Sequence, residues 1–206
     1  MVPSLPNGLR NSLLWCEASG RGWCGAELVS YDKAYFDKYL LMDESECGVN
    51  LTRARLDMVR RHYDGKGVDI GVGGGKFVEE AGWMGFDVNN DAVSWLWSNG
   101  LYCNPYANRV KAVTCWDSLE HIPEPEKLLA QIDEWLFVSM PIYKDYRDCL
   151  FSKHYRPGEH IHYFTFNGLV RFCESQGFAL VEDNTIESDL GRENIHSFAF
   201  KRYSNV

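Results

Sequence analysis

Apolar and polar residues alternate along residues 50–139 in a way that predicts short strands separated by amphipathic helices. The predicted strands are 67–70, 83–88, 112–116 and 136–140. The first two predicted helices are 50–63, with Asn50 as its cap, and 74–81. Asn90 is predicted to cap a third helix. Pro125 begins a fourth, whose apolar side carries Leu128, Leu129, Ile132 and Trp135. Strands that alternate with helices are typical of a parallel sheet with helical crossovers, so the pattern predicts a doubly wound α/β fold.

The two ends of the chain have a different pattern. Residues 1–49 are irregular and carry one helical candidate, 31–42, so they are predicted to form a cap with irregular and helical parts. The connection 141–165 is rich in aromatic residues and histidines, and connections of that length usually serve as lids or binding loops. A helix from 166 to Gly177 and strands at 178–181 and 196–201 follow, the last antiparallel to its neighbour. The predicted organisation is therefore a cap, 1–49, and one domain, 50–206, with a lid at 141–165.

Composition and charge restrict the partners. The chain has 206 residues, 45% of them hydrophobic, which suits one domain, and its formal net charge is −8. Because phosphate binding needs positive charge, this balance disfavours nucleic acid as the partner. The basic residues at 53–66 are interpreted as a solvated helix face. Seven cysteines without regular spacing, and no apolar run long enough to cross a bilayer, predict a reduced, cytoplasmic protein without a membrane span. The oligomeric state is left open.

A glycine-rich segment lies where the first strand of the repeating region meets its helix. Asp69-Ile70-Gly71-Val72-Gly73-Gly74-Gly75 would let the backbone approach a ligand closely. It does not fit a phosphate-binding P-loop, because Ile70 and Phe77 stand where that motif needs a glycine and a serine or threonine. A dinucleotide fingerprint fits only in part, because Lys76 occupies its third glycine position.

The spacing Gly71-x-Gly73-x-Gly75 with Asp69 before it resembles motif I of class I S-adenosylmethionine-dependent methyltransferases. Asp87, at the end of the second strand, stands where that family has an acid for the ribose hydroxyls. The segment Thr114–Pro123, with its Leu-Glu-His tripeptide, is similar to ubiquinone-type members, and so are His162-Tyr163-Phe164-Thr165 and the later Gly177-Phe178 pair. The resemblance covers about residues 50–201. It implies a Rossmann-like, mostly parallel sheet of seven strands, with S-adenosylmethionine as cofactor.

On this resemblance the cofactor-binding residues are Asp69, Gly71, Gly73, Gly75, Asp87 and Asp117. The sequence departs from the family between its third and fourth strands, where it is short and offers no clear acid for the adenine amino group. Asn104-Pro105-Tyr106 in that region is interpreted as a turn, because it precedes the strand that the similar box of DNA amino-methyltransferases follows.

A second pattern concerns metal. On a helical turn Asp117, Glu120 and His121 would share one face, and two carboxylates with an imidazole can hold a divalent ion. Small-RNA 2′-O-methyltransferases and some ubiquinone-pathway enzymes have a similar Glu-x-x-Glu-His pattern with a further histidine downstream, where His160 stands here. The hypothesis is a magnesium or manganese site of Asp117, Glu120, His121 and His160. The favoured alternative is that the tripeptide only caps a helix and packs.

The histidines also allow a route without metal. His121, His160 or His162 could act as the base that removes the acceptor's proton, because imidazole titrates near neutral pH. The aromatic residues of 141–165 could line an acceptor pocket or pack under a lid. The sequence thus predicts methyl transfer to an oxygen or nitrogen, with a small molecule as the favoured acceptor. The alternatives are a nucleic-acid methyltransferase and a methyltransferase-like binding module without catalysis.

Overall fold

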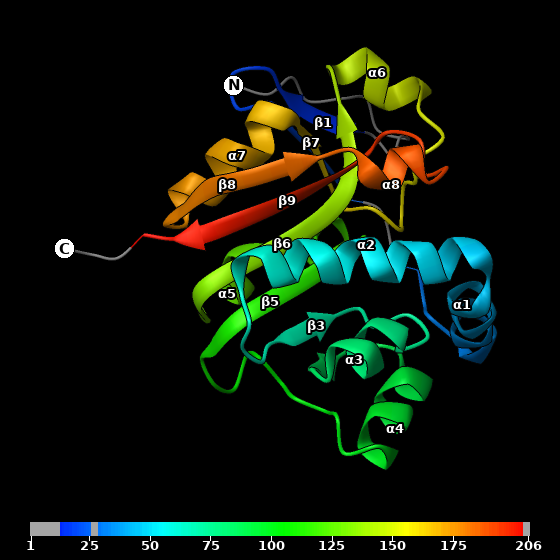
Figure 1. Ribbon diagram of the computed structural model, residues 1–206. Coiled ribbons are helices and arrows are strands. Elements are labelled where there is room, and N and C mark those ends of the chain that lie inside the picture. The colour runs from blue at the N-terminus through cyan, green and yellow to red at the C-terminus, as the bar shows by residue number, and fades with distance from the viewer. Residues whose placement is uncertain (1–12, 26–28, 204–206) are drawn as a thin grey trace.

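A nine-stranded sheet forms the centre of the computed structural model, which describes residues 13–25 and 29–203 (Figure 1). The strands are β1 (Leu13–Cys16), β2 (Arg21–Cys24), β3 (Val68–Ile70), β4 (Met84–Phe86), β5 (Val110–Trp116), β6 (Ile132–Tyr143), β7 (His162–Thr165), β8 (Phe178–Asn184) and β9 (Ile195–Arg202). The helices are α1 (Lys33–Glu44), α2 (Glu46–His62), α3 (Lys76–Ala81), α4 (Asn90–Ser98), α5 (Pro125–Leu129), α6 (Tyr146–Phe151), α7 (Phe166–Ser175) and α8 (Ile186–Asp189), with a 3₁₀ turn, η1, at Leu119–His121.

The central strands are parallel. β4, β3, β5 and β6 pair in that order, and helices connect them. β6 then has two partners on its other side: most of its length pairs antiparallel with β9, and its end pairs parallel with β7. The hairpin β1–β2 extends the sheet from β7. The doubly wound α/β class is confirmed. The sheet has nine strands, because β1, β2 and β7 pair into it beside the six strands that the hydrophobic pattern predicts.

Helices cover both faces of the sheet, and each face has its own core. On one face Leu56 and Val59 of α2 and Phe77 of α3 pack against the sheet. On the other face Leu129 of α5 and Leu169 of α7 do the same. All five side chains are buried. Burial of such a side chain contributes about 1.5–3 kcal/mol, so the two cores hold the sheet edge that carries the site.

One predicted helix is shorter than its apolar spacing indicates. The helix opened by Pro125 ends at Leu129, and Ile132 and Trp135 lie in β6 instead of on its apolar side. Ile132 pairs with Val110 of β5, and Trp135 pairs with Lys201 of β9. Sheet pairing on both sides therefore overrides a helical spacing that local sequence alone supports.

Two helix starts also differ from prediction. α2 begins at Glu46, because the Ser45 hydroxyl accepts the Gly48 N–H at 3.0 Å, and Asn50 lies inside the helix. Asn89, not Asn90, caps α4 by accepting the Asp91 N–H at 2.8 Å.

The segment 141–165, predicted as a lid, contains a helix and parts of two strands. It contains the end of β6, α6 and β7, and the His162–Thr165 strand lies between the β1–β2 hairpin and β6. The candidate helix at 31–42 is present as α1, at 33–44. Within the described ranges, none of the helices has the length and apolar character needed to cross a membrane.

Candidate cofactor and acceptor site

A cavity of about 370 Å³ opens at the carboxyl ends of β3, β4 and β5, with α1 and the start of α2 as its opposite wall. Ligands of open parallel sheets bind at this edge. Six residues predicted for the site line the cavity: Asp69, Gly71, Gly73, Asp87, Asp117 and His121. The other four, Gly75, Glu120, His160 and His162, are not part of its lining.

The glycine loop lies directly beneath α1. Gly73 has a φ of 57°, and a Cβ at this position would lie 3.2 Å from the Tyr39 ring of α1. Gly75 has a φ of 90°, and a Cβ there would come within 2.3 Å of the Trp95 ring of α4. Gly73 thus leaves room on the cavity side, whereas Gly75 is required for packing between the loop and α4.

Two aspartates, one in β3 and one directly after β4, line the cavity. Asp69 of β3 is buried and accepts a hydrogen bond from the Thr114 hydroxyl at 2.6 Å. Burial raises the pKa of Asp69 to about 8, although the Thr114 bond acts in the opposite direction. Asp87 follows β4 and accepts the Asn89 N–H at 2.8 Å. Burial also raises the pKa of Asp87, and backbone N–H groups oppose that shift.

Helix α1 and the segment directly before it present a row of tyrosines to the cavity. Tyr31, Tyr35 and Tyr39 recur at four-residue spacing, and the neighbouring ring centroids lie 4.8 Å apart. The helix is attached at both ends. Asn89 donates its side-chain N–H to the Asp32 carbonyl at 3.0 Å, and Asp43 accepts the Lys76 N–H at 3.3 Å. A cap over the cavity is therefore formed by this helix, and 141–165 adds no residue to the lining.

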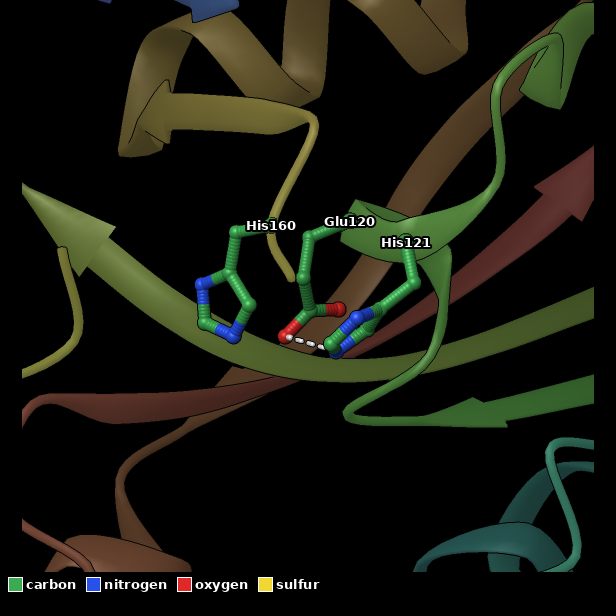
Figure 2. A group of neighbouring side chains, drawn as sticks. All are labelled: Glu120, His121 and His160. Atoms are coloured by element: carbon green, nitrogen blue, oxygen red, sulfur yellow. Dashed lines mark ion pairs between the residues drawn. The ribbon is translucent and has the colours of Figure 1, made fainter. Parts of the chain in front are cut away.

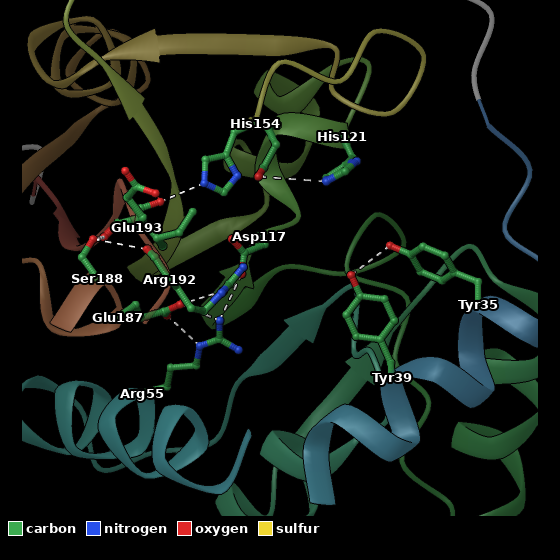
Figure 3. A network of polar contacts seen from close by, with 12 residues as sticks. Tyr35, Tyr39, Arg55, Asp117, His121, His154, Glu187, Ser188, Arg192 and Glu193 are labelled. Carbon is green, nitrogen blue, oxygen red and sulfur yellow. Dashed lines mark hydrogen bonds and ion pairs between the residues drawn. The ribbon is translucent and has the colours of Figure 1, made fainter. Parts of the chain in front are cut away.

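Four charged side chains meet at one end of the cavity, and we call them the ionic cluster: Arg55, Asp117, Glu187 and Arg192 (Figure 3). Glu187 is fully buried and accepts two hydrogen bonds from Arg55, at 2.8 and 2.9 Å, and one from Arg192 at 2.8 Å. Asp117 accepts from Arg55 at 3.1 Å and also from Arg192. The two positive and two negative charges therefore balance.

The pKa values follow from this arrangement. Burial alone would raise the pKa of Asp117, but the charges of Arg192 and Arg55 outweigh it and hold that pKa below its ordinary value. Arg55 and Arg192 have raised pKa values because both carboxylates stabilise their charged forms against the effect of burial. Arg55, Asp117 and Arg192 are therefore ionised at neutral pH.

A second group, the Glu–His cluster, consists of Glu120, His121 and His160 (Figure 2). One ligand atom from each lies within 4.8 Å of the others, and Glu120 Oε1 is 4.0 Å from His121 Nε2. His121 Nδ1 donates to the Glu159 carbonyl at 2.8 Å, which leaves the lone pair on Nε2. Both carboxylate oxygens of Glu120 and Nδ1 of His160 are buried without a hydrogen-bond partner among the described residues.

Burial sets the protonation of this cluster. It raises the pKa of Glu120 well above its ordinary value, and the neighbouring Asp117 charge raises it further. It lowers the pKa of His121 and brings the pKa of His160 to about 2. Both imidazoles are therefore neutral at neutral pH, and burial favours the protonated form of Glu120.

Asp117 does not belong to the Glu–His cluster, which corrects the four-residue metal set predicted from sequence. The predicted shared face needs one helical turn from Asp117 to His121. Instead Asp117 has a left-handed φ of 54° directly after β5, and only Leu119–His121 forms a 3₁₀ turn. The carboxylate of Asp117 consequently faces the two arginines.

His162 lies apart from both clusters. Its Nδ1 accepts from Arg21 at 3.2 Å, and its Nε2 donates to the Ile122 carbonyl at 3.0 Å. Burial and the Arg21 charge lower the pKa of His162 to about 4. With both ring nitrogens engaged, His162 connects β7 to the turn after η1, and the structure gives it no place at the cavity.

Sequence reasoning missed three members of the ionic cluster. Arg55 belongs to the basic residues at 53–66, which the sequence pattern predicts to form a solvated helix face. It nevertheless lies four residues from Leu51 and four from Val59, and both of these are buried. That spacing was a usable signal for an inward-facing residue. Glu187 and Arg192 carried no comparable signal, because only the return of the chain from β8 to β9 brings Arg192 to the cavity and Glu187 to the arginines behind it.

Comparison with known proteins identifies the family of the chain. A model of the methyltransferase domain family matches residues 44–183, which is more than half of the chain. A search of curated protein sequences finds no match.

Several solved structures share the fold. Magnesium protoporphyrin IX methyltransferase from Synechocystis PCC 6803, with bound SAH (S-adenosylhomocysteine), superposes with a TM-score of 0.57 at 14% identity and covers 83% of this chain and 95% of that one. A possible histamine N-methyltransferase from Thermotoga maritima gives 0.58 at 14% identity, covering 82% and 99%. The [4+2]-cyclase SpnF gives 0.54 at 11% identity, covering 75% and 80%. At such identities the likeness concerns the fold alone.

Proposed function

The chain belongs to the methyltransferase domain family and is an S-adenosylmethionine-dependent methyltransferase. From that premise we propose that it methylates an oxygen or nitrogen of a small molecule. One observation carries the proposal: a single cavity is lined by the glycine loop, by Asp87, by His121 and by three members of the ionic cluster, Arg55, Asp117 and Arg192. Donor and acceptor can therefore meet in one enclosed space.

The cavity suits each part of the cofactor. Asp87 can accept hydrogen bonds from the ribose hydroxyls, and Gly73 lets the backbone approach the ligand. The methionine end carries an ammonium and a carboxylate. Arg55 and Arg192 offer positive charge and Asp117 offers negative charge at the matching end of the cavity, so the ionic cluster complements this zwitterion.

The reaction is an in-line displacement. The acceptor atom forms a bond to the methyl carbon while the carbon–sulfur bond breaks, S-adenosylhomocysteine leaves, and the acceptor's proton passes to a base. His121 is the proposed base, because it lines the cavity, its Nδ1–H is held by Glu159, and its Nε2 is unprotonated at neutral pH. Holding both reactants in line supplies most of the rate enhancement.

The Glu–His cluster supports a second role for the same histidine. Its unpartnered buried atoms fit a divalent cation held by Glu120, His121 and His160. Two imidazoles with one carboxylate form a softer set than magnesium prefers, so of the two ions considered manganese fits better. Such an ion would hold an ionised acceptor oxygen. His160 serves only as a ligand in this proposal, since it does not line the cavity.

The first experiment tests cofactor binding and transfer separately. Isothermal titration with S-adenosylmethionine measures binding, and release of S-adenosylhomocysteine in the presence of candidate amines, phenols and acids measures transfer. Gly73→Arg should abolish binding because its side chain would fill the cavity, and Asp87→Ala should weaken binding by about 1–3 kcal/mol. Unchanged affinity in both variants would contradict the site. Binding without transfer to any acceptor would favour a non-catalytic module.

The second experiment tests the metal. If the cation is required, activity falls to background in excess chelator and returns with manganese, and Glu120→Ala loses activity while keeping cofactor affinity. Full activity in chelator would leave His121 as the base without a metal.

A further inference from the structure

The cavity extends to the carboxyl end of β4. β4 is the last strand of the sheet in this direction, and among the described residues its outer edge pairs with the chain only in a bridge between Gly85 and Tyr102. The Gly85 N–H donates to the Leu101 carbonyl at 2.8 Å, and Cys103 N–H donates to the Gly85 carbonyl at 2.9 Å. Instead of a further full strand, the chain turns here and enters β5 at Val110.

This turn places an aromatic ring at the rim of the cavity. Asn104 Oδ1 accepts the Tyr106 N–H at 2.9 Å, an arrangement that closes the Asn104-Pro105-Tyr106 turn locally. The Tyr106 ring lies edge-on to Phe86, with centroids 5.6 Å apart and planes at 69°. Tyr106 lines the cavity and is 39% exposed, so one part of its ring surface is free.

No carboxylate serves this end of the cavity among the described lining residues. The acidic side chains of the lining are Asp43, Asp69, Asp87 and Asp117. Asp43 contacts the start of α3, Asp69 bonds to Thr114, and Asp117 is ion-paired. Asp87 directly follows Phe86 and is the proposed ribose ligand. The amide of Asn89 is also engaged, since both of its ends are hydrogen-bonded.

We infer that Tyr106 binds the adenine ring of the cofactor by stacking, and that the protein recognises the face of the base rather than its amino group. The inference rests on the proposed function. With the ribose at Asp87, the base reaches the side of the cavity where Tyr106 stands on Phe86, and Val88, Ile122 and Pro123 complete an apolar lining.

Stacking and edge recognition differ in how strongly they select. A site built to hydrogen-bond a ligand group rejects an analogue without that group by about 10⁴–10⁵-fold. An aromatic platform accepts any base, because every base has a π-face. S-inosylhomocysteine, in which an oxygen replaces the adenine amino group, should therefore bind within about tenfold of S-adenosylhomocysteine.

The experiment is isothermal titration of both ligands into the full chain and three variants. Tyr106→Ala should weaken both ligands alike, by about tenfold, and Tyr106→Phe should retain the affinity because the ring remains. Tyr146→Ala is the matched control: Tyr146 is 38% exposed, lies on α6 and does not line the cavity. A thermal melt of each variant confirms that it is folded.

The outcomes separate this inference from the proposed function. Tight binding of S-adenosylhomocysteine that Tyr106→Ala leaves unchanged overturns the inference alone. Rejection of S-inosylhomocysteine by a thousandfold or more also overturns it, because an edge contact must then exist. Failure of the wild-type protein to bind S-adenosylhomocysteine overturns both.

Discussion

The 117–121 turn contributes to both clusters: Asp117 belongs to the ionic cluster, and Glu120 and His121 belong to the Glu–His cluster. In the ionic cluster each carboxylate has two arginine partners, and Glu187 is enclosed by three hydrogen bonds. In the Glu–His cluster the oxygens of Glu120 have no hydrogen-bond partner among the described residues.

The two clusters differ in whether their buried polar groups already have partners. A buried ion pair stabilises only when its groups satisfy each other, and the ionic cluster meets that condition without a ligand. A buried carboxyl without partners costs about 1–3 kcal/mol, which a protein retains where a ligand, proton or cation completes the site. The first cluster is thus complete in the ligand-free chain, and the second is completed by what binds there.

The largest expected effect comes from breaking the ionic cluster. Glu187→Ala leaves Arg55 and Arg192 buried with a single carboxylate between them, and it should lower the free energy of unfolding by about 3–5 kcal/mol. Urea denaturation measures this. The control is Glu193→Ala, which removes an exposed carboxylate paired with Lys153 and should change the free energy of unfolding far less, because solvent screens such a pair. Equal losses in the two variants would show that the cluster adds nothing beyond a surface pair.

The next effect tests the incompleteness of the Glu–His cluster. Manganese at a hundred times its dissociation constant should raise the free energy of unfolding by about 2.7 kcal/mol, because it binds only the folded chain. Glu120→Gln keeps the shape of the side chain but removes the anionic ligand, so the increase should disappear. An increase of the same size in the variant would place the ion elsewhere.

Arg192→Gln tests whether the ionic cluster also binds ligand. The variant retains Arg55 between the two carboxylates but loses one positive charge at the cavity, so S-adenosylhomocysteine should bind about 1–3 kcal/mol more weakly. Adenosine lacks the methionine end and should bind with unchanged affinity. Equal weakening of both ligands would contradict the assignment of this end of the cavity.

Asp69 is intermediate between the clusters, because it has one hydroxyl partner. Its pKa is raised from 3.8 to about 8, so between those values the folded state binds a proton that the unfolded state has lost. Stability from this group is therefore full below about pH 4 and falls as pH rises toward 8, by at most about 1.4 kcal/mol per unit. Unfolding of the wild type and Asp69→Asn at pH 6 and 7 measures it. An identical pH dependence in both would contradict the raised pKa.

The sequence by itself determined the repeating part of the fold. The α/β alternation, the glycine loop between β3 and α3, and Asp87 after β4 are local features, because each depends on spacing within one strand–turn–helix unit. The same features also indicated the methyltransferase family, and the family match over residues 44–183 confirms it. The roles of individual residues toward the cofactor remain predictions.

Only the tertiary structure decided which distant residues meet. Ile132 and Trp135 form a strand because β5 and β9 pair with them, and Arg192 reaches Asp117 only because β9 returns beside β6. The predicted group of Asp117 with Glu120 failed for a related reason: one left-handed residue after β5 turns its side chain toward partners 62 and 75 positions away. Burial and pairing across such separations depend on the whole packed chain, so no local spacing encodes them.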